Sequence, residues 1–170
     1  MNRTQIGPEI ASNDRPEIRQ AGSADRAAIG EFFTGLSART MLLRFFTAAP
    51  SLTAPMLRVL AGGGDHTDVI VATECGRVIG HAMAVDAAET GGIRRADIGV
   101  VVADAWQGRG IGSALVRALT GRAVARGVTA LAMDVLAENR RVLAMIARRW
   151  PEAHHARAGT SVTVHVSPAC

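Results

Sequence analysis

The sequence contains neither lysine nor tyrosine, although 19 of its 170 residues are arginine. Without lysine the chain cannot carry the GxxxxGK[ST] loop of P-loop proteins, in which the lysine contacts the phosphates. Without tyrosine it has no phenol group that could donate a proton. The two cysteines, Cys75 and Cys170, are too few for a disulfide framework and lack the spacing of metal ligands. Free thiols are typical of a reducing compartment, and no metal site is expected.

Long apolar segments are also missing. No apolar run approaches the about 18 residues that a helix needs to cross a bilayer. The first twenty residues are polar and lack the apolar core of a signal peptide. We therefore expect a cytoplasmic protein that has no membrane partner.

Aromatic residues make up only 4% of the chain, and its arginines are spread along the sequence. A nucleic-acid-binding surface usually needs a clustered basic patch, and single strands need aromatic platforms on which bases stack. Nucleic acid is therefore not expected as a partner. The net charge of +4 suits instead the attraction of a polyanionic cofactor.

The length and the hydrophobic pattern predict one α/β domain over residues 16–170, preceded by a flexible tail at 1–15. Strands are expected at 17–21, 68–74, 78–85, 96–102, 128–135, 153–158 and 161–166. Helices are expected at 24–36 with Ser23 as N-cap, at 38–46, from a Ser51 cap to the glycines at 62–64, from about Ile111, and at 138–149. This order of elements predicts a mixed sheet with helices packed against it.

The most informative segment is WQGRGIG, residues 106–112, between a predicted strand and a predicted helix. The first N–H groups of a helix have no partner within the helix, and together with the helix dipole they favour an anion. Glycines allow a phosphate to approach the backbone closely. We therefore predict a phosphate-binding loop with these members: Gln107, Gly108, Arg109, Gly110, Ile111, Gly112 and Ser113.

Two other interpretations of this loop stay open. The dinucleotide-binding fingerprint GxGxxG or GxGxxA fails at its last position, which Ser113 occupies, although Asp134 lies on the next predicted strand. The loop could also be a tight turn that only connects a strand to a helix.

The motif does not stand alone, because Gln-x-x-Gly-x-Gly after a β-rich strand resembles the acyl-CoA loop of the GNAT superfamily of N-acetyltransferases. ADIGVVVADAWQGRGIGSAL is similar to the central strand, loop and helix of that family, and LAENRRVLAMIARRW to its next strand and helix. GLSARTMLLRFF, residues 35–46, resembles bacterial protein lysine acetyltransferases that act on acyl-CoA synthetases. The resemblance spans about residues 17–166.

This resemblance implies a mixed, mostly antiparallel sheet that splays at the acyl-CoA site. Acetyl-CoA would be the co-substrate, with its pantetheine along the backbone of Val100, Val101 and Val102 and its pyrophosphate on the predicted loop. Asn139 stands at the family's usual asparagine position. The N–H of Val102 would bind the thioester oxygen and its developing negative charge.

The amine that attacks the thioester must first lose a proton, since a lysine amine has a pKa of about 10.4. A nearby carboxylate can accept that proton directly or through water. Aligning the strand on QGRGIG places Asp97 where members of the resembling subgroup have a glutamate, and a bridging water would compensate for the shorter side chain. A solvent-facing strand residue is the alternative for Asp97. Weaker candidates are Asp104, Glu138, Glu74, His81, His154 and His155.

Two departures from the family pattern stand out. Many members donate a proton to the leaving thiolate from a tyrosine, and Ile146 occupies that position here; Trp150-Pro151 replaces the usual Gly-Phe. The sequence predicts an acetyl-CoA-dependent protein lysine acetyltransferase, with an acyl-CoA synthetase as the type of protein substrate. The alternatives are acetylation of a small amine, for which a deep acidic pocket would be expected, and an acyl-CoA-binding module with little catalysis.

Overall fold

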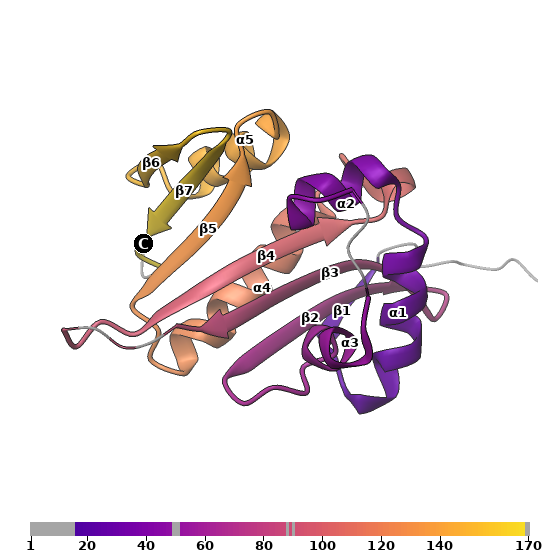
Figure 1. The fold of residues 1–170 in the computed structure, drawn as a ribbon. Coiled ribbons are helices and arrows are strands. Elements are labelled where there is room, and N and C mark those ends of the chain that lie inside the picture. Colours follow the sequence, from indigo (N-terminus) through magenta and orange to yellow (C-terminus); the bar gives the residue numbers. More distant parts are fainter. Residues whose placement is uncertain (1–15, 49–51, 88, 90, 169–170) are drawn as a thin grey trace, which may run out of the picture.

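The structure, a computed structural model, describes residues 16–48, 52–87, 89 and 91–168 of the chain, so the predicted tail at 1–15 lies outside the described residues. Seven strands form one twisted sheet in the order β1-β2-β3-β4-β5-β7-β6 (Figure 1). All neighbouring strands are antiparallel except β4 and β5, which are parallel. The predicted mixed, mostly antiparallel sheet with flanking helices is confirmed.

The order of elements also agrees with the prediction. The strands are β1 Glu17–Gln20, β2 Thr67–Glu74, β3 Arg77–Asp86, β4 Arg95–Val102, β5 Ala130–Leu136, β6 His154–Ala158 and β7 Ser161–Val166. The helices are α1 Arg26–Thr34, α2 Ala38–Phe45, α3 Ala54–Leu60, α4 Ile111–Ala125 and α5 Arg140–Arg149, with short 3₁₀ turns at Ser23–Asp25 and Asp104–Trp106.

Alternation along the strands divides the interior into two cores, one on each face of the sheet. Helices α1, α2 and α3 cover one face, where Phe33 and Val101 are buried. Helix α4 covers the other face, and residues of α5 pack into the same core as Leu115 and Leu119 of α4. In β4 the side chains of even-numbered residues therefore face α4, whereas those of odd-numbered residues face α2.

Several helix starts differ from the prediction because local hydrogen bonds place them elsewhere. Ser23 does not cap α1, since Ser23–Asp25 form a 3₁₀ turn in which the Asp25 carboxylate accepts the Gly22 N–H at 2.7 Å. Thr53 caps α3; the predicted cap, Ser51, lies outside the described residues. Asn139 is the N-cap of α5, so Glu138 precedes that helix and does not belong to its first turn.

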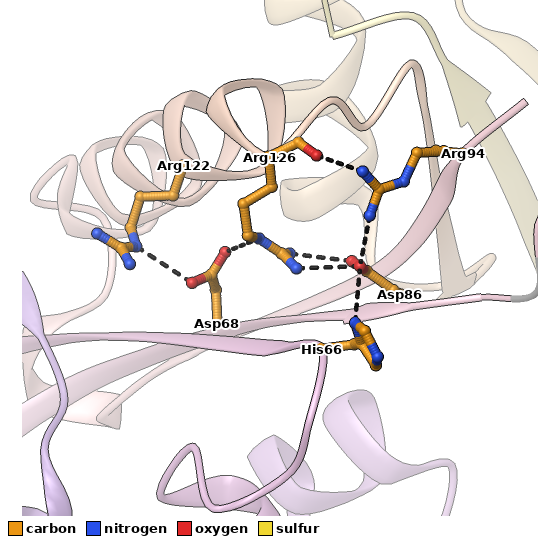
Figure 2. Close-up of polar contacts among 6 residues, drawn as sticks. All are labelled: His66, Asp68, Asp86, Arg94, Arg122 and Arg126. Carbon is orange, nitrogen blue, oxygen red and sulfur yellow. Dashed lines mark hydrogen bonds and ion pairs between the residues drawn. The ribbon is translucent and has the colours of Figure 1, made fainter.

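An ion-pair network joins the C-terminal end of α4 to strands β2 and β3 (Figure 2). The buried Asp68 carboxylate lies 3.2 Å from Arg122 Nε and 2.7 Å from Arg126 Nε. Asp86 lies 2.9 Å from Arg126 Nη2 and 3.6 Å from Arg94 Nη2. The network fixes the helix whose other end follows the glycine loop.

We expect Asp68→Asn to lower the free energy of unfolding by about 2–3 kcal/mol. The substitution leaves two arginines facing a buried amide. Breaking a buried ion pair costs about 3–5 kcal/mol. The cost is smaller here because both arginines reach solvent. Urea unfolding followed by circular dichroism measures the change. The exposed Asp65 serves as the control, since Asp65→Asn should have almost no effect, and equal stability of both variants would contradict the prediction.

Candidate functional site

The site begins where strands β4 and β5 part. Their pairing runs from Arg95↔Ala130 to Asp97↔Ala132 and stops there, so the second half of β4 has a neighbour only on its β3 side. Figure 1 shows the two strands diverging beyond this point. The predicted splay of the sheet is thus present, and it leaves an edge of β4 backbone open.

The hydrogen bonds of β4 show which of its peptide groups face the opening. Ala103 donates its N–H to Ile79 of β3, and Arg95 accepts from Ala87, so odd-numbered residues direct their polar groups toward β3. Antiparallel pairing alternates, and the N–H groups of Val100 and Val102 therefore face the opening. Val101 lines the opening, but its own N–H and C=O are directed to β3.

The glycine loop follows β4 and ends at the first turn of α4. Gly108 and Gly110 have φ angles of +80° and +82°, the left-handed region that glycine adopts without strain, and Gly110 is the N-cap of α4. Within the described residues, the N–H groups of 108–113 have no acceptor. Six free donors at a helix N-terminus form the kind of site that binds phosphate.

One cleft of about 330 Å³ joins the open edge of β4 to this loop. It brings together nine of the predicted site residues: Val100, Val101, Val102, Gln107, Gly108, Gly110, Gly112, Ser113 and Asn139. Two members of the predicted loop, Arg109 and Ile111, lie outside its lining. The Arg109 guanidinium stacks on the Trp106 ring at 4.6 Å, and the Ile111 side chain is buried in the core, although its N–H remains free.

The Gln107 side chain is hydrogen-bonded within the protein and is not free to bind phosphate. Its amide nitrogen donates to the Val102 carbonyl at 3.1 Å and to Thr40 Oγ1 at 3.2 Å, and its oxygen accepts from Arg141 at 3.1 Å. These bonds connect the loop to β4, α2 and α5. Both hydrogen-bonding ends of the amide are therefore already engaged.

Asp104 links the loop to the start of α2 through hydrogen bonds. Its carboxylate accepts hydrogen bonds from the hydroxyls of Ser37 at 2.7 Å and Thr40 at 2.8 Å. Partial burial acts to raise the pKa of this carboxyl, but the hydrogen bonds from Ser37 and Thr40 outweigh it and hold the pKa below its ordinary value. Asp104 is thus an ionised anchor for the loop.

Asn139 places the N-terminus of a second helix at the cleft. Its side-chain oxygen accepts the N–H of Val142 at 3.3 Å, which caps α5. Four α5 residues line the cleft, namely Arg141, Val142, Met145 and Arg148. Glu138, one of the weaker candidates for the base, instead pairs with Arg39 at 2.9 Å.

Asp97 lies outside the cleft, at the last paired position before β4 and β5 part. Its side chain faces the α2 side of the sheet, is 60% exposed, and lies 3.5 Å from Arg95 Nε. It borders a second hollow of about 240 Å³ together with Asp134 of β5 and with Gly99. Arg44 of α2 lines both this hollow and the cleft, so the two openings meet at that side chain.

None of the described histidines lines either opening. His81 is fully buried, and its Nε2 lies 2.8 Å from the Leu60 carbonyl. Burial lowers the pKa of His81 to about 4, so the ring is neutral near pH 7. The interpretation of His81 as a packed residue is confirmed, and His154 and His155 lie exposed on β6 as expected.

Sequence reasoning did not find the contribution of α2. Leu43 and Arg44 line the cleft with Thr40, although these residues precede the glycine loop by more than 60 positions. Neither their spacing nor their chemistry indicates that contact.

The residues that the structure describes contain no cluster of three or more metal-ligating side chains, and none of the described helices could span a membrane.

Comparison with known proteins identifies the family. The acetyltransferase (GNAT) family model matches residues 38–149. The GNAT domain of S. lividans PAT aligns with a TM-score of 0.79 and 22% identity, covering 89% of this chain and 90% of that one. No curated protein matches the sequence.

Two further solved structures share the fold. Ribosomal-protein-alanine N-acetyltransferase from Brucella melitensis aligns with a TM-score of 0.70 and 21% identity, covering 89% of this chain and 99% of that one. A phosphinothricin acetyltransferase from Sinorhizobium meliloti, in complex with acetyl-CoA, aligns with a TM-score of 0.69 and 20% identity, covering 89% of this chain and 88% of that one.

Proposed function

Because the chain belongs to the acetyltransferase (GNAT) family, we propose that it transfers the acetyl group of acetyl-CoA to a lysine ε-amine of a protein substrate. The observation that carries this proposal is the cleft, in which free loop N–H groups and an open strand edge lie in one continuous space. A donor with a pyrophosphate at one end and a thioester at the other matches that arrangement.

The loop N–H groups of 108–113 would bind the pyrophosphate, with Arg141 and Arg148 supplying positive charge at the same cleft. The pantetheine would run along β4, where it can pair with the peptide groups that face the opening. The N–H of Val102 is our proposed donor to the thioester oxygen. Val100 directs its N–H the same way, closer to the point where β4 and β5 part.

The acceptor would enter from the opposite side, through the hollow beside Asp97. Side chains that border this hollow are open to solvent: Asp97 is 60% exposed, Phe46 44% and Val85 36%. A shallow, exposed surface suits a lysine that projects from a protein better than it suits a small molecule enclosed in a pocket. This openness supports the protein substrate.

In the proposed reaction, the ammonium loses a proton to Asp97, directly or through one water. The neutral amine then attacks the thioester carbon, forming the N–C bond. The C–S bond breaks, the nitrogen loses its second proton to water, and the CoA thiolate leaves and takes up a proton from that water. Ile146, at the family's tyrosine position, is fully buried in the core, and its hydrocarbon side chain has no proton to give in this last step.

Acetylation of a small cationic amine is the second candidate. The presence of two carboxylates, Asp97 and Asp134, in one hollow favours it. A thiol-release assay with acetyl-CoA separates the two candidates when proteins and small amines are offered at matched amine concentration. Turnover only with small amines would overturn the protein substrate, and no turnover with any amine would favour a binding module.

The absence of lysine gives a further prediction. The untagged enzyme, incubated with acetyl-CoA, should gain no acetyl group on a side-chain nitrogen, because it has no ε-amine and an arginine guanidinium stays protonated at any workable pH. A protein substrate in the same tube should gain mass in steps of one acetyl group. Intact-mass spectrometry with peptide mapping makes the comparison, and acetylated internal side-chain nitrogens on the enzyme would contradict the prediction.

A further inference from the structure

Arg44 lies in the last turn of α2 and reaches the place where the cleft and the acceptor-side hollow meet. Its guanidinium lies directly over Gly99 of β4. A Cβ at position 99 would overlap the guanidinium, and the nearest atom is Nη2. The glycine therefore makes room for a cation against the strand at the foot of the opening.

This cation has no counter-ion among the described residues. Within the part of the chain that the structure describes, Arg44 forms no hydrogen bond or ion pair, and its Nε is buried without a partner, whereas its Nη atoms stay accessible. Its guanidinium carbon lies 4.9 Å from the centre of the Phe45 ring. Burial lowers the pKa of Arg44 to about 10, which still leaves it charged near pH 7. An unpaired charge in such a place is unfavourable unless a ligand compensates for it.

A small cavity of about 50 Å³ extends the cleft past Val100. Its walls are mostly apolar and include Ile98, Val135 and Ile146, while Arg44 is the one cation among its described lining residues. Asp134 borders it from β5, where its carboxylate accepts the Thr163 hydroxyl at 2.6 Å. With the thioester oxygen on the Val102 N–H, the acyl chain of a bound donor would extend past Val100 toward this cavity. An acetyl methyl, which is short and apolar, would bring no polar partner to the guanidinium.

We propose that the Arg44 guanidinium binds the free carboxylate of a short dicarboxylic acyl group, so that the enzyme accepts thioesters such as succinyl-CoA as well as acetyl-CoA. A guanidinium and a carboxylate form charge-assisted hydrogen bonds, and these are strongest where water is partly excluded. The carboxylate would also neutralise the repulsion between Arg44 and an incoming ammonium held near Asp97. This inference extends the donor range of the proposed function and does not depend on the identity of the acceptor.

The chemistry of transfer is unchanged. The neutral amine attacks the thioester carbon, the N–C bond forms, the C–S bond breaks, and CoA leaves as a thiolate that takes up a proton. The free carboxylate stays on the acyl chain and is neither consumed nor protonated. The product is an amide that carries a negative charge in place of the amine's positive one.

Calorimetric titration of the full chain tests the proposal without an acceptor. Succinyl-CoA and butyryl-CoA have the same four-carbon chain and differ in the terminal carboxylate. The wild-type protein should bind succinyl-CoA at least about tenfold more tightly than butyryl-CoA. In Arg44→Met the ratio should fall to one or below. Gly99→Ala, which keeps every charge but displaces the guanidinium, should also reduce it.

Arg148→Met is the matched control. It removes a cation that lines the cleft but not the small cavity, so it should leave the succinyl-to-butyryl ratio unchanged. Equal binding of the two donors by the wild-type protein would overturn the proposal, even if neither Arg44 nor Gly99 variants fold. A preference for succinyl-CoA that survives in Arg44→Met would overturn its assignment to Arg44. Failure to bind acetyl-CoA at all would instead overturn the proposed function, and this inference with it.

Discussion

Replacing Gly110 by valine should weaken acetyl-CoA binding by at least about a hundredfold. Gly110 has a φ of +82°, and a β-branched residue does not adopt that conformation without strain. Apart from its chain neighbours, no described residue has an atom within 4 Å of a Cβ placed there, so the new side chain would occupy the space of the ligand. The free N–H groups around it would no longer point at one phosphate. Losing two hydrogen bonds to a charged group, at about 1.5–3 kcal/mol each, accounts for the size of the effect.

The chain offers a matched control for this strain. Gly76, in the turn between β2 and β3, has a φ of +75°, and an added Cβ there would likewise meet no atom of the described residues within 4 Å beyond its chain neighbours. Gly76→Val should therefore show a similar loss of stability with unchanged acetyl-CoA affinity. Calorimetric titration of both folded variants gives the comparison. Acetyl-CoA binding of wild-type strength in folded Gly110→Val would show that the loop does not hold the pyrophosphate.

The loop was predictable because its signal is local. Glycines that need positive φ, a strand before them and an amphipathic helix after them all fall within one continuous segment of sequence. The open edge of β4 followed from the family resemblance rather than from periodicity, since a strand that lacks a neighbour has the same residue pattern as one that is paired.

The α2 side of the site was not predictable in this way. Arg44 and Thr40 reach the cleft only because α2 packs across the end of β4, and the bonds from Asp104 to Ser37 and Thr40 join residues more than 60 positions apart. Gln107 shows a related limit. Its position in the motif favoured a phosphate contact, yet its amide is engaged by Thr40, Val102 and Arg141, which only the tertiary structure brings near it.

The position of Asp97 makes the base hypothesis testable. Asp97 is the last β4 residue paired with β5, so it stands at the foot of the opening, on the side from which the acceptor would enter. Asp97→Asn keeps the shape of the side chain but removes its ability to accept a proton. Asp134→Asn removes the other carboxylate of the same hollow and controls for a general loss of negative charge.

If Asp97 accepts the proton, Asp97→Asn should lower turnover by about 10²-fold or more at neutral pH, with little change in acetyl-CoA affinity. The loss should shrink as the pH rises toward about 10.4, the ordinary pKa of a lysine amine, because the acceptor then arrives neutral without a base. Asp134→Asn should weaken the apparent affinity for a cationic acceptor, through KM, and should leave the pH dependence of kcat as in the wild type. A pH series of initial rates for all three proteins gives the comparison. Full activity of Asp97→Asn at pH 7, or a loss that stays constant up to pH 10, would remove Asp97 from the proton transfer and leave that step to Asp134 or to water alone.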